Sequence, residues 1–375
     1  MKKLRLAFLP FVVFSTILGC SNNSNSPANP PSNSDSQPLE EKNYINYLGR
    51  YQTETYGGEE IVSFSYTASG FEIKINIESE QYSLDMKLLS TLFDNYQEQY
   101  INIYIDNIIT SKEKLVSGVN VISSFKDLSL GEHIIRVNKL NEAAFSKIGL
   151  IGFDLQGVSI LEIEKRDRKI IEFYGDSITC GYGNLGKQNE NFSMATEDGM
   201  QSYGQLTADH LGWDASIISY SGIALAMSPF NSPFTLLDKY DTVDGYKKWD
   251  FKTYTPDVVV INIGTNDNTA YRQLTGTAQE EATELFLNSY KTLMTNLKTA
   301  YPNVKIVCVT NMMLELHGFL NMCMQGAVQQ LNNLYGEFAY YHEFLPNNQG
   351  SNGHPGVQAH IKNGKELADI IETII

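Results

Sequence analysis

A short apolar run that ends in Gly175-Asp176-Ser177 constrains the fold of this chain more than any other stretch. The run, residues 169–174, has the length of one buried strand and is too short for a helix. Gly175 permits a sharp exit from that strand, and the small residues after it can begin a helix. A serine at such a corner would hold its hydroxyl outside the sheet, beside backbone N–H groups that a helix N-terminus leaves unpaired. This position suits a nucleophile whose reaction creates an oxyanion.

Gly-Asp-Ser alone is a weak signal, because a turn with a helix-capping serine explains it more simply. Three further motifs downstream change this interpretation. Gly222 follows the strand-like run 215–218, Asn266 follows the strand-like run 257–263, and His354 precedes a helical pattern near the C-terminus. Ser, Gly, Asn and His, in this order and each at a strand or loop end, resemble the four blocks of the SGNH (GDSL-type) hydrolases.

By this resemblance, Ser177 would attack an ester and His354 would act as base and then as acid to the leaving alcohol. The backbone N–H groups of Ser177 and Gly222, with the side-chain amide of Asn266, would form the oxyanion hole. Each residue also has a structural explanation: Gly222 could be a turn, Asn266 a strand-end cap and His354 a surface histidine. All three explanations would have to hold at once to replace the catalytic interpretation. The remaining histidines have no companion motif: His133, His210, His317, His342 and His360.

The acid of a catalytic triad is absent from its expected positions. SGNH enzymes generally place an aspartate three residues before the histidine, and one branch places it two before. These positions hold Ser351 and Asn352 here. Changing the aspartate of an established triad to asparagine costs about ten-thousand-fold in rate, mainly through the wrong imidazole tautomer. We therefore predict a Ser177–His354 dyad, with the imidazole oriented by a backbone carbonyl near residues 352–353.

Asp267 and Glu343 are the alternatives for a distant third member of the site. Either carboxylate would need to lie within hydrogen-bond reach of the His354 ring, and such a contact would replace the dyad with a triad.

The segment from Tyr44 to about Glu164 shows two-residue alternation of apolar and polar side chains and no long helical period. Strands are predicted at residues 71–77, 101–105, 133–137 and 158–163. Several short strands with polar turns between them indicate an antiparallel sandwich of the jelly-roll type. We therefore expect an all-β domain over residues 44–165.

The charged stretch 164–169 marks a change to strands that alternate with helices. Ser202 and Gln205 are predicted to cap a helix that ends at Gly212, and residues 277–280 are predicted to cap a second helix. The apolar stripe of the second helix is Ala282, Leu285, Phe286, Leu293 and Leu297, and a buried strand is expected at 304–309. This alternation predicts an α/β domain over residues 166–375, with a parallel sheet and helices on both faces.

The N-terminus has the features of an export signal. Residues 1–19 combine three cations with an apolar core that is too short to span a bilayer comfortably. The sequence around Cys20 resembles the bacterial lipoprotein box, which implies that Cys20 is lipidated; an ordinary signal peptide with an incidental cysteine is the alternative. Residues 20–43 are rich in Ser, Asn and Pro, so we interpret them as a tether. We expect an exported bacterial lipoprotein, periplasmic or on the cell surface.

The formal net charge of -15 at pH 7 argues against a surface that binds nucleic acid or anionic membrane. With Cys20 acylated, Cys180, Cys308 and Cys323 remain, an odd number without the spacing of a metal site. Cys180 is close to Ser177 in sequence and is interpreted as a packed thiol. We expect no metal, no cofactor, no membrane contact beyond the lipid anchor, and a monomer.

The exported sandwich and SGNH domain, together with residues 104–106, 219–222 and 350–355, resemble carbohydrate esterase family 2. The resemblance covers nearly everything from Tyr44 onward, and some members of that family lack the triad acid. It implies removal of O-acetyl groups from plant polysaccharides such as xylan and glucomannan. The aromatic clamp that holds the sugar in that family is not assigned here, although Phe230, Trp249 and Tyr271 lie in suitable loops.

Two other functions remain open from the sequence. One is a lipase-like or thioesterase-like SGNH enzyme that acts on lipid acyl chains. The other is a glycan-binding lipoprotein whose esterase site has decayed, which the missing acid makes worth testing.

Overall fold

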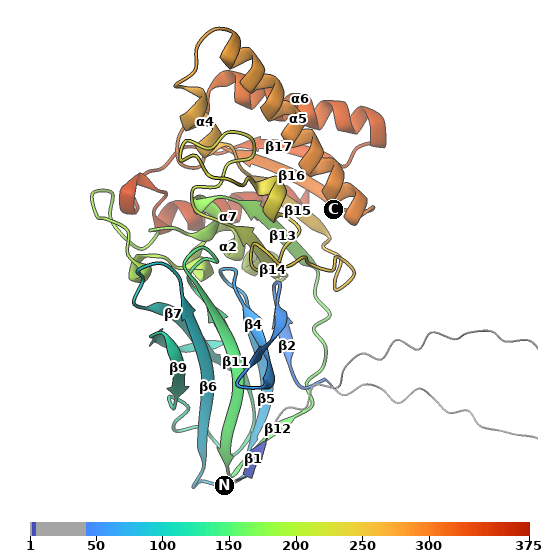
Figure 1. The fold of residues 1–375 in the computed structure, drawn as a ribbon. Helices are drawn as coiled ribbons and strands as arrows, with labels where there is room; N and C mark the ends of the chain where they lie inside the picture. Colours follow the sequence, from blue (N-terminus) through green and yellow to red (C-terminus); the bar gives the residue numbers. More distant parts are fainter. Residues whose placement is uncertain (1, 5–42) are drawn as a thin grey trace, which may run out of the picture.

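Alternating apolar and polar residues fold the first part of the chain into two antiparallel sheets that pack face to face (Figure 1). The structure is a computed structural model that describes residues 2–4 and 43–375. One sheet consists, in spatial order, of β3 (Gln52–Tyr56), β4 (Glu59–Phe64), β11 (Ser146–Gln156), β6 (Ser83–Leu92) and β9 (Gly118–Ile122), with β1 (Lys2–Leu4) paired to β11. The other consists of β12 (Val158–Leu161), β5 (Gly70–Ile77), β10 (Gly131–Lys139), β7 (Gln99–Ile105) and β8 (Ile108–Leu115), with β2 (Asn46–Leu48) paired to β5.

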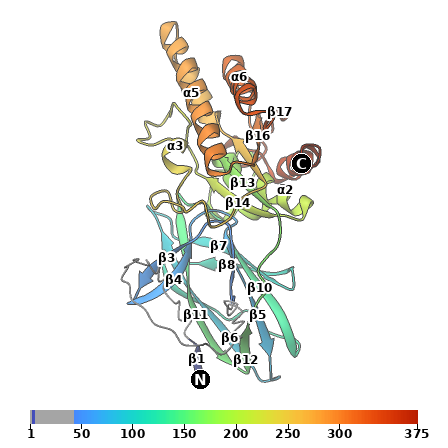
Figure 2. The ribbon, with the colours of Figure 1, turned by 90° about the vertical axis from the view of Figure 1, so that its right-hand side faces the viewer.

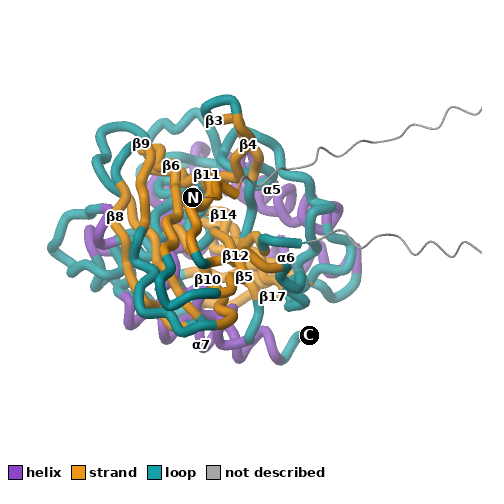
Figure 3. Tube along the Cα trace, turned by 90° about the horizontal axis from the view of Figure 1, so that it is seen from below, coloured by secondary structure: helices purple, strands orange, loops and turns teal. Residues whose placement is uncertain are grey.

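The space between these two sheets is filled by one apolar core, made mainly of isoleucine, leucine and phenylalanine side chains. Figure 3 looks along the sandwich and shows its strands in front of the helical domain. The four strands predicted from alternation correspond to β5, β7, β10 and β12. The jelly-roll sandwich predicted from the sequence is confirmed.

The second domain is built on a parallel sheet. Its strands, in spatial order, are β14 (Asp214–Ser219), β13 (Ile170–Gly175), β15 (Val258–Asn262), β16 (Lys305–Thr310) and β17 (Ala339–Glu343). Helices α2 (Tyr203–Leu211) and α7 (Val357–Glu372) pack on one face, and α5 (Thr277–Ala300) and α6 (Gly318–Tyr335) pack on the other (Figure 2). Short helices complete the domain: α1 (Ser177–Cys180), α3 (Leu236–Lys239), α4 (Thr265–Tyr271), and the 3-10 turns η1 (Met194–Thr196), η2 (Gly199–Gln201) and η3 (Ser351–Gly353).

The predicted start and end of α2 are confirmed, but only the Ser202 half of the predicted cap is present, because the Gln205 amide donates to Asp209 at 2.8 Å. The Ser202 hydroxyl accepts a hydrogen bond from the backbone N–H of Gln205 at 3.4 Å, and Gly212 ends the helix in the left-handed conformation. The predicted cap of α5 is wrong, because Gly276 holds the cap position and Thr277 is already the first helical residue. Leu285 was also wrongly assigned to the buried stripe and is 51% exposed, since it lies about 100° around the helix from its neighbour in the core.

The sandwich is joined to the α/β domain by a buried arginine. Arg50 enters the second domain, where its guanidinium forms an ion pair with Glu172 at 3.0 Å and both side chains are 0% exposed. The same guanidinium donates to the hydroxyl of Tyr174 at 2.6 Å and to the carbonyl of Thr242 at 2.8 Å. The junction between the two domains therefore contains a buried charge whose ionic and hydrogen-bond partners are present.

The predicted lipidation site Cys20, most of the predicted signal segment and nearly all of the predicted tether lie outside the described residues. Among the residues that are described, no helix has the length and hydropathy needed to cross a bilayer.

Candidate active site

Ser177 begins the short helix α1 directly after strand β13. The carboxylate of Asp176 caps this helix by accepting a hydrogen bond from the backbone N–H of Ile178 at 3.0 Å. A Cβ atom on Gly175 would lie 2.1 Å from the hydroxyl oxygen of Thr179, so the corner accommodates only glycine. The serine therefore lies at a sharp strand-to-helix turn, where the sequence motif predicts it.

Parallel pairing brings the ends of three strands to one edge of the sheet. Gly175, at the end of β13, pairs with Ser219 of β14 on one side and with Asn262 of β15 on the other. The loop after β14 carries Gly222, and helix α4 after β15 carries Asn266. The serine, glycine and asparagine motifs therefore meet at the carboxyl edge of the sheet, the usual place for a site in an α/β fold.

The loop that carries His354 is attached to the segment that follows α1. Ser351 donates its backbone N–H to the carbonyl of Gly183 at 2.9 Å, and Asn352 donates its backbone N–H to the carbonyl of Glu190 at 3.0 Å. Gly183 has a φ of +62°, and a Cβ atom there would lie 2.6 Å from the Cβ of Ser351. Glycine thus permits the close approach that holds the histidine loop against the serine loop.

His354 contacts Ser177 directly, with 2.8 Å between the imidazole Nε2 and the serine Oγ. Burial lowers the pKa of His354 to about 4, and the backbone carbonyls of Ser351 and Asn352 act in the opposite direction. The imidazole is therefore neutral at neutral pH. In the tautomer that accepts the serine proton at Nε2, the ring hydrogen is on Nδ1.

Neither residue at the expected acid positions supports the imidazole through its side chain. Ser351 is buried, and its hydroxyl oxygen has no hydrogen-bond partner among the described residues. The Asn352 amide donates instead to the hydroxyl of Tyr182 at 3.3 Å. Within the described part of the chain, Nδ1 of His354 also lacks a partner, so the nearby backbone carbonyls affect its pKa without completing a hydrogen bond.

The two alternative carboxylates have other partners. Asp267 accepts hydrogen bonds from three successive backbone N–H groups, those of residues 225–227. Glu343 lies on β17 and accepts from the hydroxyl of Tyr341 at 2.8 Å. Across residues 43–375, no carboxylate forms a hydrogen bond with His354, so the structure presents a dyad.

A row of aromatic rings packs against the imidazole. The ring centroids of Tyr182 and His354 are 4.5 Å apart, and Tyr182 stacks on Phe192 with centroids 3.9 Å apart and planes 12° apart. The row continues into the sandwich through Phe145, 5.3 Å from Phe192, and Tyr96, 4.6 Å from Phe145. The Tyr182 ring therefore packs against the imidazole and restricts its movement.

Two of the three predicted oxyanion donors, Gly222 and Asn266, lie on connected segments. The Asn266 amide nitrogen donates to the carbonyl of Ile223 at 2.8 Å, which uses one of its two hydrogens and leaves the second for a ligand. Gly222 immediately precedes Ile223 and has a φ of +76°. The asparagine thus supports the short loop that presents the glycine N–H.

Of the three aromatics considered for a sugar clamp, only Phe230 is accessible. It is 67% exposed, and its ring lies 3.4 Å from the position that a Cβ atom on Gly222 would take. Trp249 is 7% exposed and packs over the guanidinium of Arg50, and Tyr271 is 1% exposed at the end of α4. Trp249 and Tyr271 both belong to the core, and Tyr271 lies in a helix where a loop was expected.

The other histidines have structural partners away from Ser177. His360 is buried, and its Nδ1 accepts the backbone N–H of Tyr203 at 3.0 Å, which caps the start of α2. The remaining four lie in strands, caps or helix ends: His133 beside Asp106, His342 beside Glu366, His317 at the start of α6 and His210 in the last turn of α2.

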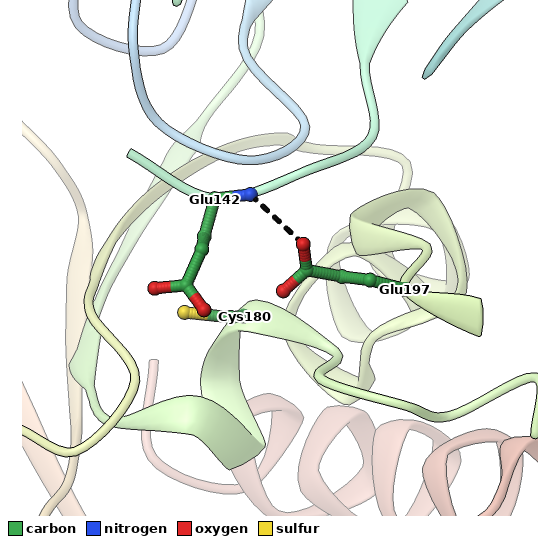
Figure 4. Close-up of side chains that lie close together, drawn as sticks. All are labelled: Glu142, Cys180 and Glu197. Carbon is green, nitrogen blue, oxygen red and sulfur yellow. Dashed lines mark hydrogen bonds between the residues drawn. The ribbon is translucent and has the colours of Figure 1, made fainter. Parts of the chain in front are cut away.

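A buried polar cluster behind the site has no counterpart in the sequence motifs. Figure 4 shows Glu142, Cys180 and Glu197 with their polar atoms turned toward one another, all within 4.8 Å. Glu142 comes from the sandwich, between β10 and β11, and its backbone N–H donates to the carboxylate of Glu197 at 3.1 Å. Burial raises the pKa of the Cys180 thiol well above its ordinary value, so the thiol is protonated at neutral pH.

The two domains match two protein-family models. Residues 47–163 match the carbohydrate esterase 2 N-terminal family, and residues 173–346 match the GDSL-like Lipase/Acylhydrolase family.

Two curated relatives have similar sequences. The cellulase/esterase CelE of Acetivibrio thermocellus is 31% identical over 348 residues, which cover 87% of this chain and 39% of CelE. An acetylxylan esterase / glucomannan deacetylase of Cellvibrio japonicus is 23% identical over 303 residues, 77% of this chain and 80% of the relative. This chain therefore spans well under half of CelE and most of the second relative.

Solved structures show the same two-domain arrangement. A family two carbohydrate esterase from Clostridium thermocellum, in complex with cellohexaose, has a TM-score of 0.77 and 26% identity, over 88% of this chain and 98% of that one. The acetyl xylan esterase Est2A of Butyrivibrio proteoclasticus has the same TM-score with 20% identity, which supports the fold alone. The two family models, in this order along the chain, together with the likeness to CelE and to the 26%-identical family two esterase, show that the chain belongs to carbohydrate esterase family 2.

Proposed function

We propose that this chain is a serine esterase that removes O-acetyl groups from plant polysaccharide. The observation that carries the proposal is the 2.8 Å contact between Ser177 Oγ and the neutral His354 Nε2 at the carboxyl edge of the sheet. A serine hydroxyl beside a neutral imidazole is the arrangement needed for acyl transfer. The relatives named acetylxylan esterase / glucomannan deacetylase support acetylated polysaccharide as the substrate class.

In the first half of the reaction, Ser177 Oγ attacks the acetyl carbonyl carbon while its proton passes to His354 Nε2. The sugar oxygen leaves with that proton, which yields a free sugar hydroxyl and an acetyl-serine. In the second half, His354 takes a proton from water, the resulting hydroxide attacks the ester, and acetate leaves as the serine regains its proton. The backbone N–H groups of Ser177 and Gly222 and the amide of Asn266 stabilise both oxyanions.

Among residues 43–375, the imidazolium formed in each half-reaction has no carboxylate partner. The carbonyls of Ser351 and Asn352 already favour its charged form, and the ring centroid of Tyr182 lies 4.5 Å from that of the imidazole, near enough for an aromatic ring to stabilise a cation. These neutral groups stabilise the cation less than an aspartate would. We therefore expect the rate to be limited by imidazolium formation more than in an enzyme with a complete triad.

The substrate class is tested by acetate release from acetylated xylan and acetylated glucomannan, with Ser177→Ala measured beside the wild type. The proposal predicts release by the wild type and none above background by the variant. Phe230 beside Gly222 offers an exposed apolar ring for the sugar, so Phe230→Ala is expected to raise KM more than it lowers kcat.

A chain-length series of p-nitrophenyl esters distinguishes the two alternative functions. A deacetylase loses activity steeply beyond acetyl or propionyl, whereas a lipase-like enzyme keeps or gains activity with longer chains. A decayed site would give glycan affinity without turnover, unchanged in Ser177→Ala.

The N-terminal sequence supports a second part of the proposal, that the protein is exported and anchored through a lipid on Cys20 and acts as a monomer. Detergent partitioning of the full chain and of Cys20→Ala tests whether a lipid anchors the protein. Light scattering of the catalytic chain without detergent tests whether its mass is that of a monomer. A Cys20→Ala variant that still partitions with the membrane would contradict lipid anchoring at this position.

A further inference from the structure

We propose that Glu142 of the sandwich domain is a positioning residue that holds the oxyanion loop of the catalytic domain. The oxyanion loop is defined as residues 220–223, which contain Gly222. This inference rests on the proposed esterase function and adds that the sandwich forms part of the catalytic apparatus.

The contact is made by both oxygens of one carboxylate. Oε2 of Glu142 accepts the backbone N–H of Ser221 at 2.7 Å, and Oε1 accepts the hydroxyl of Ser221. Glu142 is 0% exposed, so its carboxylate is shielded from bulk water. A bidentate contact of this kind fixes both the backbone and the side chain of Ser221, the residue directly before Gly222.

The opposite end of the oxyanion loop is held from the sheet side. The Asn266 amide donates to the carbonyl of Ile223 at 2.8 Å, and the backbone N–H of Ile223 donates to the carbonyl of Tyr220 at 3.3 Å. Gly222 therefore lies between one anchor from the sandwich and one from α4. The direction of its N–H depends on both anchors, and a hydrogen-bond donor that is fixed before reaction stabilises an oxyanion most effectively.

The surrounding charges explain how a carboxylate is kept at this buried position. Burial raises the pKa of Glu142 and of Glu197, and the hydrogen bonds from Ser221 oppose that shift at Glu142. Lys139 is also buried, and its Nζ donates a hydrogen bond to the carbonyl oxygen of Glu142 at 3.2 Å. Two carboxylates this close cannot both ionise readily. Ser221 bonds both oxygens of Glu142, whereas in the described part of the chain Glu197 accepts hydrogen bonds at Oε2 alone, so the charge is favoured on Glu142 and the proton on Glu197. The thiol of Cys180 lies within 4.8 Å of both carboxylates.

The structure offers a matched control for loss of contact between the domains. Gln52, also on the sandwich and 8% exposed, donates its amide to Asp244 of the catalytic domain at 3.0 Å. Gln52→Ala removes a part-buried contact across the same junction without touching the oxyanion loop.

The test measures kcat, KM and the unfolding midpoint with p-nitrophenyl acetate for the wild type, Glu142→Ala, Glu142→Gln, Ser221→Ala and Gln52→Ala. Glu142→Ala is expected to lower kcat about ten- to a hundredfold, less than loss of an oxyanion donor itself, with KM within about twofold. Glu142→Gln keeps the shape and one acceptor oxygen, so it should lose less. Gln52→Ala should keep the wild-type kcat.

A double-mutant cycle checks that Glu142 acts through Ser221. Glu142→Ala/Ser221→Ala should be no slower than Glu142→Ala alone, because both changes release the same loop. Folded Glu142 variants with the wild-type kcat would overturn the inference, as would an equal loss of kcat in Gln52→Ala. Should Glu142→Ala fail to fold, Glu142→Gln and Ser221→Ala decide the question. An inactive wild type would instead contradict the proposed function.

Discussion

The ring of Tyr182 lies against the imidazole of His354, with centroids 4.5 Å apart and planes inclined by 41°. Phe192 holds Tyr182 from the other side at 3.9 Å. Because no carboxylate contacts the imidazole in the described part of the chain, this packing is the nearest substitute for the missing acid.

Tyr182→Ala should therefore lower kcat by about five- to tenfold, the loss expected when a contact with the imidazolium worth ~1 kcal/mol is removed. Tyr182→Phe keeps the ring and loses only the hydrogen bond from Asn352, so its kcat should stay near the wild-type value. Steady-state kinetics on p-nitrophenyl acetate provide the measurement. Equal losses in the two variants would show that the hydroxyl, and not the ring, supports the site.

The low pKa of His354 predicts the acid limb of the pH profile. Catalysis requires the neutral imidazole, and burial lowers its pKa to about 4. The value of kcat/KM should therefore persist as the pH falls below the ordinary histidine range and decline only near pH 4.

Asp176 is the matched control for this pH profile, because burial raises its pKa to about 7. Asp176→Asn retains an oxygen that can cap Ile178 and should leave the acid limb of His354 in place. Near-ultraviolet circular dichroism at each pH establishes that the protein is folded. An acid limb near pH 6.5 in both proteins would contradict the account of a buried, neutral base.

Asn266→Ala removes one oxyanion donor and also releases the carbonyl of Ile223. We expect kcat to fall about a hundred- to a thousandfold, with a smaller change in KM, because the donor acts mainly in the transition state. Stopped-flow measurement of the acylation step would locate the loss. A variant with an unchanged acylation rate would remove Asn266 from the oxyanion hole.

The junction between the domains predicts a change in stability. Arg50→Met leaves Glu172 buried without its cationic partner and should lower the free energy of unfolding by about 3–5 kcal/mol. Lys248→Ala, at an ion pair with Asp241 whose lysine is 70% exposed, should leave it nearly unchanged. Urea denaturation followed by fluorescence compares the variants. Similar losses in both would indicate that the Arg50–Glu172 pair is not what stabilises the junction.

The fold and the serine–histidine contact were predictable because each depends on a local signal that parallel pairing then assembles. Gly175 ends a buried strand, and Asn266 follows another, so both necessarily reach the same edge of the sheet. The contacts of Tyr182 and Glu142 were not predictable in this way. Each depends on a side chain that crosses between loops or domains, and no spacing in the sequence records such a contact.

Burial also limited prediction from residue type. Trp249 and Tyr271 have the chemistry of a sugar clamp but lie in the core, whereas Phe230 is exposed beside Gly222. The cap of α5 failed for a similar reason: Thr277 and Glu280 have the spacing of a capping box, yet the chain enters the helix at Gly276 with a positive φ. Local composition permits such alternatives, and tertiary packing selects among them.

The central claim is that Ser177 becomes acetylated during turnover. Rapid quenching of the wild type with p-nitrophenyl acetate, followed by peptide mass spectrometry, should find one acetyl group on the peptide that contains Ser177, and none on that peptide in Ser177→Ala. Turnover by the wild type with no acetyl group on this serine, or full activity in Ser177→Ala, would contradict the account.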